Sequence, residues 1–220
     1  MNKKIIEGRG KFISFEGPEG SGKTTQARRL ITRLEENGLE VVYTREPGGT
    51  PTGEAIREIL QHDKTGDEIS PKAEVLLFAA SRAQLVSHVI LPALERGAWV
   101  VCDRFADSTT AYQGYGRGFE VEQMIAINQF AIGNAVPDKT ILLDLDPNNG
   151  FKRVAQRLLK NSDTLDRIES EARSFHERVR NGYIELAGKW PERFRIIDAS
   201  RDEDTVFEDI RRIVRDEFGI

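Results

Sequence analysis

Cysteine and long apolar runs are both scarce in this chain of 220 residues. The single cysteine, Cys102, excludes an intrachain disulfide framework and a zinc site built from several cysteines. A lone thiol suits a reducing compartment, so we expect a cytoplasmic protein. The apolar stretch VLLFAA at 75–80 is closed by Ser81 and Arg82, well short of the ~20 residues that a membrane-spanning helix needs. We therefore expect no membrane span.

A large excess of basic residues is also missing. The chain has 32 Lys and Arg and 36 Asp and Glu, which gives a net charge of −4. This charge argues against nucleic-acid binding as the main role. The segment 1–10 has neither the apolar centre of a signal peptide nor a transit-peptide pattern. It contains IEGR, a protease-processing sequence, so whether these residues are native stays open. We treat 1–10 as a tail and 11–220 as one domain.

Short apolar segments that suit buried strands alternate with amphipathic segments that suit helices. The strand segments are 11–16, 40–44, 99–103, 139–146 and 193–198. The helical segments are about 23–37, 54–61, one after Pro71, and about 120–132, 147–159, 168–189 and 203–218. Apolar runs without alternation are typical of parallel strands covered on both faces. The sequence thus predicts a three-layer α/β fold, a five-stranded parallel sheet flanked by helices, with the ligand site beyond the strands' carboxyl ends.

The clearest motif is GPEGSGKT at 17–24, which fits the phosphate-loop pattern G-x-x-x-x-G-K-S/T directly after a predicted strand. Such a loop (P-loop) turns backbone amides toward phosphate oxygens. We expect Lys23 to reach the β- and γ-phosphates of ATP and Thr24 to hold Mg²⁺. A glycine-rich turn without a ligand is the alternative. The predicted ATP-binding residues are Gly17, Pro18, Glu19, Gly20, Ser21, Gly22, Lys23, Thr24 and Thr25.

Charged residues follow two further strands. Asp103 ends WVVCD, where P-loop proteins place a carboxylate near Mg²⁺, although an aspartate there can also cap a helix. Arg45 and Arg104 each follow a strand, so both should lie at the carboxyl edge of the sheet. Because arginine forks around phosphate, the pair predicts a clamp for an acceptor phosphate. Either arginine alone would suggest only a solvated surface charge.

A nucleotide-dependent switch is the alternative from another class of protein. A GTPase needs NKxD after a strand, and the sequence has none; DKTG at 63–66 fits DxxG but follows a helix, so we interpret it as a turn. The histidines, His62, His88 and His176, fall in helical segments and are not candidate bases. A phosphate monoester is mostly dianionic at neutral pH and can attack without a base, whereas a hydroxyl acceptor would want one.

Five ordered segments resemble thymidylate kinase of the bacterial type: FEGPEGSGKTTQ, REPGGT, AEVLLFAASRAQL, DRFADSTTAYQGYGRG and LDRIE. The similarity runs from about Phe12 to Ala199. It implies transfer of the γ-phosphoryl group of Mg²⁺-ATP to dTMP, giving dTDP and ADP in dTTP biosynthesis, by a homodimer. The apolar stripe after Pro71 would look the same if it packed on its own sheet. A deoxynucleoside kinase, which phosphorylates a hydroxyl, is the alternative enzyme.

The resemblance also implies roles for the acceptor residues. Phe78 would stack on thymine and Arg82 would donate to its O4; the two lie four residues apart, on one helix face. Without the resemblance, Phe78 would suggest core packing. Glu19 would contact the sugar 3′-hydroxyl, and Tyr112 would crowd the 2′ position, with helix packing as its alternative. The further nucleotide contacts implied are Thr109 and Gln113.

A lid is implied at about 153–167, where this chain departs from the family. The stretch KRVAQRLLKNSDTLDRIE is longer than usual and has no glycine, and Ala155 replaces an arginine for which Lys160 is a candidate substitute. Arg153 and Arg157 match family arginines. We favour Arg157 over Arg153 and Arg167 for the transition-state charge; Arg167 could instead pair with Asp166 or Glu169 at a helix start. The predicted catalytic residues are Lys23, Arg104, Asp103, Arg157 and Arg153. Arg117, in GYGRG, has no derived role.

Overall fold

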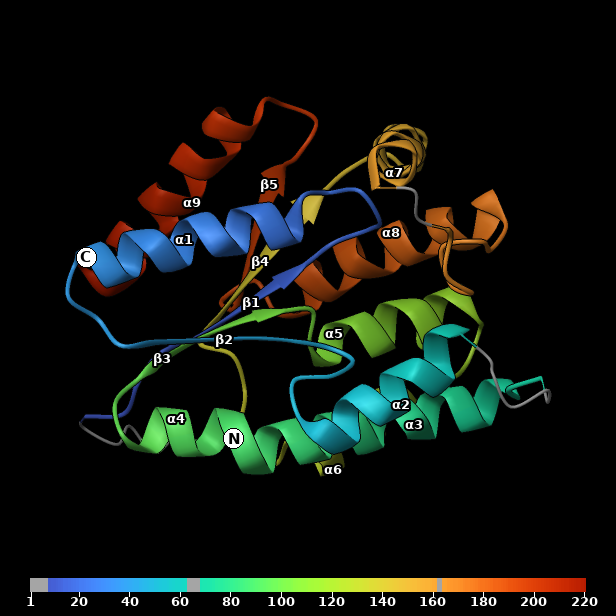
Figure 1. The fold of residues 1–220 in the computed structure, drawn as a ribbon, viewed down its shortest axis with the longest axis horizontal. Coiled ribbons are helices and arrows are strands. Elements are labelled where there is room, and N and C mark those ends of the chain that lie inside the picture. Colours follow the sequence, from blue (N-terminus) through green and yellow to red (C-terminus); the bar gives the residue numbers. More distant parts are fainter. Residues whose placement is uncertain (1–7, 63–67, 162–163) are drawn as a thin grey trace.

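The structure, a computed structural model, describes residues 8–62, 68–161 and 164–220. Its centre is one parallel sheet in the order β2-β3-β1-β4-β5 (Figure 1). The strands are β1 (Phe12–Glu16), β2 (Val41–Arg45), β3 (Trp99–Asp103), β4 (Lys139–Asp144) and β5 (Phe194–Asp198). All five lie within the predicted segments or one residue beyond them, so the predicted fold class is confirmed.

Helices cover both faces of the sheet (Figure 1). On one face α1 (Lys23–Glu36) and α9 (Glu203–Phe218) pack on the side chains of Ile13, Phe15 and Val101. The opposite face carries the other side of the pleat, where Phe12 and Val100 contact the helices that follow β2. The remaining helices are α2 (Pro51–His62), α3 (Pro71–Leu85), α4 (Leu91–Glu95), α5 (Ala106–Thr109), α6 (Val121–Ile132), α7 (Pro147–Asn161) and α8 (Arg173–Lys189), with π-helical turns at Val86–Ile90 and Thr110–Gly116.

One helix begins later than predicted, and one helical segment was not predicted. The helix expected at 168–189 begins only at Arg173. Before it, the Asp166 carboxylate accepts hydrogen bonds from the amides of Ile168 (2.9 Å) and Glu169 (2.7 Å), as a helix N-cap does, but the turn that it caps ends before Arg173, where a separate helix begins. The sequence also gave no sign that the chain after β3 is helical from Ala106 to Gly116. DKTG at 63–66 lies outside the described residues.

The segment Pro71–Glu95 forms one continuous helical run of 25 residues. Its mean hydropathy reaches 1.4 over an 18-residue window, of which 33% is buried, so length and composition are in the range of a spanning helix. A count of unbroken apolar residues did not anticipate this, because the run includes Glu74 and Arg82. Both charged side chains are buried and paired within the protein, as in a core helix of a globular domain.

Candidate functional site

The P-loop leaves β1 and enters α1 at the carboxyl edge of the sheet. Gly17 and Gly20 have positive φ angles of 143° and 72°. A Cβ on Gly17 would lie 2.4 Å from the Leu143 carbonyl oxygen, and one on Gly20 would lie 2.5 Å from that of Gly150. Only glycine therefore fits at these two positions. The loop is held tightly between the ends of β1 and β4 and the start of α7.

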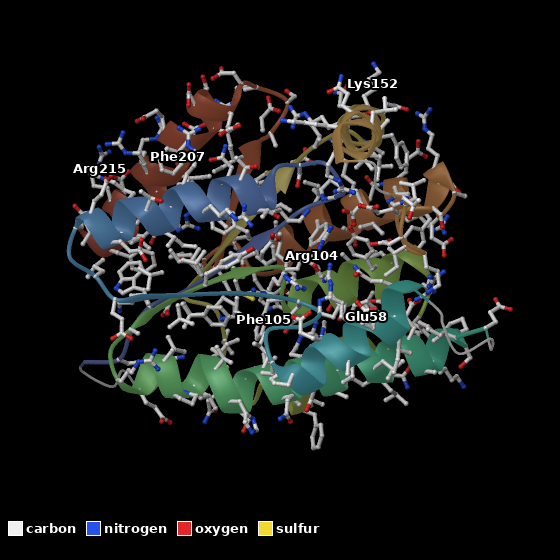
Figure 2. All side chains as sticks on the ribbon, in the orientation of Figure 1. Glu58, Arg104, Phe105, Lys152, Phe207 and Arg215 are labelled. Atoms are coloured by element: carbon white, nitrogen blue, oxygen red, sulfur yellow. The ribbon has the colours of Figure 1, made fainter. Side chains whose placement is uncertain are left out.

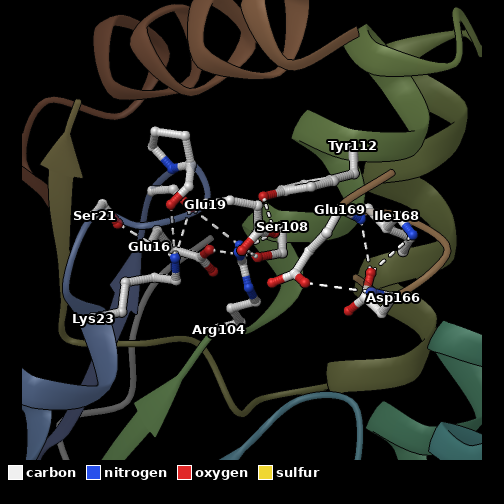
Figure 3. A network of polar contacts seen from close by, with 12 residues as sticks. Glu16, Glu19, Ser21, Lys23, Arg104, Ser108, Tyr112, Asp166, Ile168 and Glu169 are labelled. Carbon is white, nitrogen blue, oxygen red and sulfur yellow. Dashed lines mark hydrogen bonds and ion pairs between the residues drawn. The ribbon is translucent and has the colours of Figure 1, made fainter. Parts of the chain in front are cut away.

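Lys23 folds back over this loop (Figure 3). Its Nζ donates to the carbonyl oxygens of Gly17 (3.1 Å) and Pro18 (2.9 Å) and to Ser21 Oγ (3.3 Å). Burial, with the nearby Arg104 guanidinium, lowers the pKa of Lys23 to about 8. The ammonium thus stands at the mouth of the loop, where an incoming phosphate would offset its loss of hydration.

A pocket of about 420 Å³ opens beside the loop. It brings together most of the predicted site residues, although they come from six separate segments of the chain. The predicted residues that line it are Glu19, Gly20, Gly22, Lys23, Thr24, Thr25, Arg45, Phe78, Arg82, Asp103, Arg104, Thr109, Tyr112, Gln113, Arg153 and Arg157. Gly17, Pro18 and Ser21 are not among the lining residues; their oxygens face Lys23 instead.

Two oxygen ligands suited to a hard cation meet at the pocket wall. Thr24 Oγ1 donates a hydrogen bond to Asp103 Oδ2, across the gap between α1 and β3. Hydroxyl and carboxylate oxygens fit Mg²⁺, which is commonly bound by one or two protein ligands together with substrate phosphates and water. In the described parts of the chain, no group of three or more His, Cys, Asp or Glu could hold a metal. Nucleotide phosphates would therefore have to complete the coordination.

Arg104 is the one non-glycine residue in the described ranges with a positive φ angle, 68°. Its Nη1 donates to the Gly17 carbonyl (3.1 Å), its Nη2 donates to Glu19 Oε1 (2.6 Å), and its guanidinium carbon lies 5.0 Å from the centre of the Tyr112 ring. Left-handed backbone at a non-glycine residue is a sign of strain that recurs at functional sites. The guanidinium is thus held on the P-loop side of the pocket (Figures 2 and 3).

Glu16, which the sequence analysis missed, lies beneath Arg104. It is fully buried at the end of β1 and accepts hydrogen bonds from the Phe105 amide (2.8 Å), Ser108 Oγ (2.6 Å) and Tyr183 Oη (2.8 Å). Burial and the nearby Asp107 charge raise its pKa to about 7. Its position at the end of an apolar strand, just before the loop, was the only sequence signal.

The surroundings of Glu19 lower its pKa, whereas those of Glu16 raise it. Its Oε1 accepts from Arg104 and from Tyr112 Oη (2.9 Å). Although burial opposes ionisation, the Arg104 and Lys23 charges lower the pKa of Glu19 to about 2. The loop carboxylate is thus ionised at neutral pH and paired rather than directed alone at a phosphate.

Phe78 and Arg82 line the pocket from α3, on one face as their spacing indicated. Arg82 is 1% exposed, and its guanidinium contacts Glu46 (Nε to Oε2, 2.9 Å), Asn128 (Nη1 to Oδ1, 2.7 Å) and Thr109 (Nη2 to Oγ1, 3.0 Å). This network orients the side chain rigidly. Glu46 and Asn128 carried no sequence signal because they are distant from Arg82 along the chain. Whether Arg82 contacts a base stays a prediction.

The second expected clamp residue, Arg45, lines the same pocket but has partners of its own. Its Nη1 donates to the Pro47 carbonyl (3.0 Å) and its Nη2 to Glu54 Oε2 (3.0 Å). On the neighbouring helix, Arg57 also donates to the Pro47 carbonyl (3.0 Å) and lines the pocket. The sequence analysis missed Arg57, since nothing distinguished it from other polar residues of α2.

The predicted lid contributes two arginines to the pocket wall. Arg153 Nη1 lies 3.4 Å from the Gly20 carbonyl, and Arg157 Nη2 lies 2.7 Å from Glu169 Oε1. The alternative drawn for Arg167 is wrong. Its guanidinium contacts Glu74 and the Leu60 carbonyl, not Asp166 or Glu169, because the local turn points it away from the pocket toward α3.

The phosphate loop after β1, the aspartate that ends β3 and the ring of arginines around one pocket define a P-loop kinase of the nucleotide-phosphorylating class. The thymidylate kinase family model matches residues 15–210. The chain is 52% identical over 202 residues to the thymidylate kinase of Pelotomaculum thermopropionicum, covering 92% of this chain and 91% of that one. It is 49% identical over 201 residues to that of Deinococcus radiodurans, covering 91% and 94%.

The solved thymidylate kinase of Ehrlichia chaffeensis aligns with a TM-score of 0.73 at 33% identity, over 94% of this chain and 99% of that chain. The chain therefore belongs to the thymidylate kinase family. Its activity is that of the family, phosphorylation of dTMP to dTDP with ATP in dTTP synthesis.

The buried Glu16 carboxyl should make stability depend on pH. Its pKa is about 7 in the folded protein against 4.5 for a glutamate exposed to water, so its stabilising contribution is complete below pH 4.5 and is lost as pH rises through 7. The size of this loss is about 3 kcal/mol. The glutamine in Glu16→Gln cannot titrate. We therefore expect the unfolding free energy of this variant, relative to that of the wild type, to be higher at pH 8 than at pH 5 when both are measured by urea unfolding.

Glu19→Gln is the matched control. With a folded pKa near 2, Glu19 is ionised in both states above pH 5, so this change should alter the unfolding free energy equally at both pH values. The same pH-independent difference for Glu16→Gln would contradict the assignment.

Proposed function

We propose that this pocket binds ATP and dTMP together and passes the γ-phosphoryl group directly from one to the other. The observation that carries the proposal is that the P-loop, Arg45, Arg104 and Phe78 line one pocket. An amide-lined anion site and an arginine-lined anion site are thereby set within reach of each other. Two phosphates that must meet in line need such paired positions.

The donor half of the site is residues 17–25. The backbone amides of this loop would bind the ATP phosphates, with Lys23 on the β- and γ-phosphates. Thr24 and Asp103 would hold Mg²⁺, which neutralises charge on the phosphate oxygens when it is bound. The Arg104–Gly17 contact joins the two halves, because it places a guanidinium against the same loop.

The acceptor half surrounds Phe78. Its ring would stack on the thymine base, with Arg82 donating to O4 while Glu46 fixes the plane of the guanidinium. Arginine has no acceptor, so a carbonyl at this position is favoured over an amino group. Tyr112 and Glu19 would contact the sugar, supported by their mutual hydrogen bond. The remaining acceptor contacts are Arg45, Arg104, Thr109 and Gln113.

The charge that develops during transfer would be neutralised from three parts of the chain. Lys23 belongs to the P-loop, Arg104 follows β3, and Arg153 and Arg157 come from the proposed lid at about 153–167 of a single kinase domain, residues 11–220. No histidine lines the pocket as described. This suits an acceptor that is already dianionic, since such a phosphate needs no general base. A pocket enclosed by the lid would also keep out water, which competes with dTMP for the phosphoryl group.

We also propose a homodimer in the cytoplasm. Leu76 on α3 is 61% exposed and Phe130 on the adjoining α6 is 92% exposed, an apolar surface that a second copy would cover. Neither nucleic acid nor membrane is a proposed partner: the net charge is −4, and two charged side chains of the apolar helix, Glu74 and Arg82, are buried and paired inside the protein. The single, buried thiol of Cys102 suits a reducing compartment.

The activity is tested by coupled measurement of ADP release with dTMP, dUMP, UMP, dCMP and thymidine as acceptors. We expect dTMP to have the highest kcat/KM among these acceptors. A higher value for thymidine would instead favour a deoxynucleoside kinase. Equal, slow ADP release with and without acceptor would contradict transfer altogether.

Removal of the Phe78 ring should weaken acceptor binding selectively. We expect Phe78→Ala to raise KM for dTMP about tenfold to a hundredfold, since stacking on a base contributes about 1–3 kcal/mol, and to leave KM for ATP within twofold. Phe207→Ala on α9, across the sheet from the pocket, is a matched ring deletion that should change neither constant. Equal increases in both constants for Phe78→Ala would point to a packing defect.

Removal of the Arg104 guanidinium should act on the transition state. We expect Arg104→Ala to lower kcat/KM for dTMP by about 10²- to 10⁵-fold, the range for comparable charge donors. Steady-state kinetics measures this effect, and Arg96→Ala, a surface arginine paired with Glu40, is the control. A loss smaller than tenfold, in a variant that unfolds at the same urea concentration as wild type, would show that Arg104 is not the clamp.

A further inference from the structure

A second buried carboxylate, Glu74, lies behind the pocket rather than in its wall. It sits in the first turn of α3, has no solvent exposure, and is not a lining residue. A buried carboxylate is costly unless all its oxygens are hydrogen bonded. Each Glu74 oxygen has two donors. Oε1 accepts from Gln113 Nε2 (2.8 Å) and Arg117 Nε (2.9 Å), and Oε2 accepts from Arg117 Nη2 (3.0 Å) and Arg167 Nη2 (2.5 Å).

The donors come from two segments that form the pocket. Gln113 lines the pocket from the π-helical turn that also carries Tyr112, and Arg117 follows that turn directly. Arg167 belongs to the segment 164–171, whose neighbouring residues Asp166, Ile168 and Glu169 also line the pocket. One carboxylate thus joins α3 to both segments.

Further contacts tie the segment 164–171 to the same place. Arg167 Nε donates to the Leu60 carbonyl (3.1 Å) and Gln61 Nε2 to Asp166 Oδ2 (3.2 Å), both from α2. Arg117 Nη1 also donates to Glu171 Oε1 (2.6 Å). The Glu74 cluster, defined here as Glu74, Gln113, Arg117, Arg167 and Glu171, therefore balances two positive with two negative charges.

We propose that Glu74 is a positioning residue that holds the segment 164–171 against the acceptor side of the pocket and fixes Gln113 toward the substrate. This role rests on the proposed function of the pocket as the dTMP site. Arg117 and Arg167 converge on one carboxylate oxygen, so loss of its charge leaves two neighbouring guanidinium groups with only the Glu171 carboxylate, which contacts Arg117, to offset their charge. Their repulsion would move the segment away from α3, because it is joined there by side chains alone.

The consequence is specific to the acceptor. Residues of the cluster contact α2, α3 and the turn at Thr110–Gly116, and none of these hydrogen bonds goes to the P-loop, which meets that turn through Glu19 and Tyr112 instead. Opening the segment 164–171 would displace Asp166, Ile168 and Glu169 from the pocket wall while Lys23 and Thr24 keep their contacts. A residue that only stabilised the fold would instead affect both substrates and the whole chain.

The test compares Glu74→Gln, which keeps the size of the side chain, with wild type. We expect KM for dTMP to rise about tenfold, the effect of ~1.4 kcal/mol, with KM for ATP within twofold. Amide hydrogen exchange should quicken in residues 164–171 and 113–118 and stay unchanged in the strands. Arg167→Gln should reproduce the effect, and the double variant should be no worse than either single one, since both remove the same contact.

Arg173→Gln is the matched control. Its arginine pairs with Glu177 on the exposed start of α8, close in sequence but outside the cluster, and it should leave KM for dTMP and the exchange pattern unchanged. Unaltered KM for dTMP and unaltered exchange in Glu74→Gln would overturn the proposal, as would equal increases in both KM values with faster exchange throughout the chain. If wild type itself does not phosphorylate dTMP, the proposed function fails, while the exchange measurement still tests whether Glu74 holds the segment.

Discussion

Parallel pairing of β1 with β3, in a register that sets Phe15 opposite Asp103, places the functional groups of this protein. The P-loop begins where β1 ends, and Arg104 follows where β3 ends. The Arg104 amide donates back to the Phe15 carbonyl (2.9 Å), and the Phe105 amide donates to Glu16. These two hydrogen bonds hold the left-handed backbone of Arg104 in place. Its guanidinium is thereby directed to the Gly17 carbonyl rather than to solvent.

Buried charge at this edge is organised by pairing. Glu19 pairs with Arg104, Glu46 with Arg82, and Glu74 with two arginines. Arginine suits these positions because its flat fork satisfies several acceptors at once and keeps its charge when desolvated. Every pair lies beside the pocket. Each arginine therefore has a carboxylate partner that neutralises its charge before a phosphate ligand binds. Glu16 differs, because its hydrogen-bond donors are hydroxyl and amide groups, and burial together with the nearby Asp107 charge raises its pKa to about 7.

The proposed donor and acceptor halves of the pocket are built from different parts of the chain. The donor half is built from backbone, a glycine loop held against the carbonyls of Leu143 and Gly150, and it tolerates little side-chain change. The acceptor half is built from side chains on α3 and the turn at Thr110–Gly116, supported from behind by the Glu74 cluster. In the proposed function, selectivity for one nucleotide over another would therefore depend on the second half, where residues from distant segments must be held together.

The strands and the phosphate loop could be predicted from the sequence, because each depends on interactions between residues that are close together in the chain. Apolar runs bounded by turn residues specify the five strands, and the spacing of Gly17, Gly22, Lys23 and Thr24 specifies a phosphate loop, because each depends on neighbours within about one helical turn or strand. The chain order of strand and loop also places Asp103 and Arg104 at the correct edge of the sheet.

What only the tertiary structure decided is which buried charges meet. The carboxylate partners of Arg82, Arg104, Arg117 and Arg167 lie 36 or more residues away along the chain, and only packing brings them within hydrogen-bonding distance. The turn at Asp166, by contrast, was a local feature that helix periodicity concealed: Asp166 caps a single turn, and a separate helix begins at Arg173.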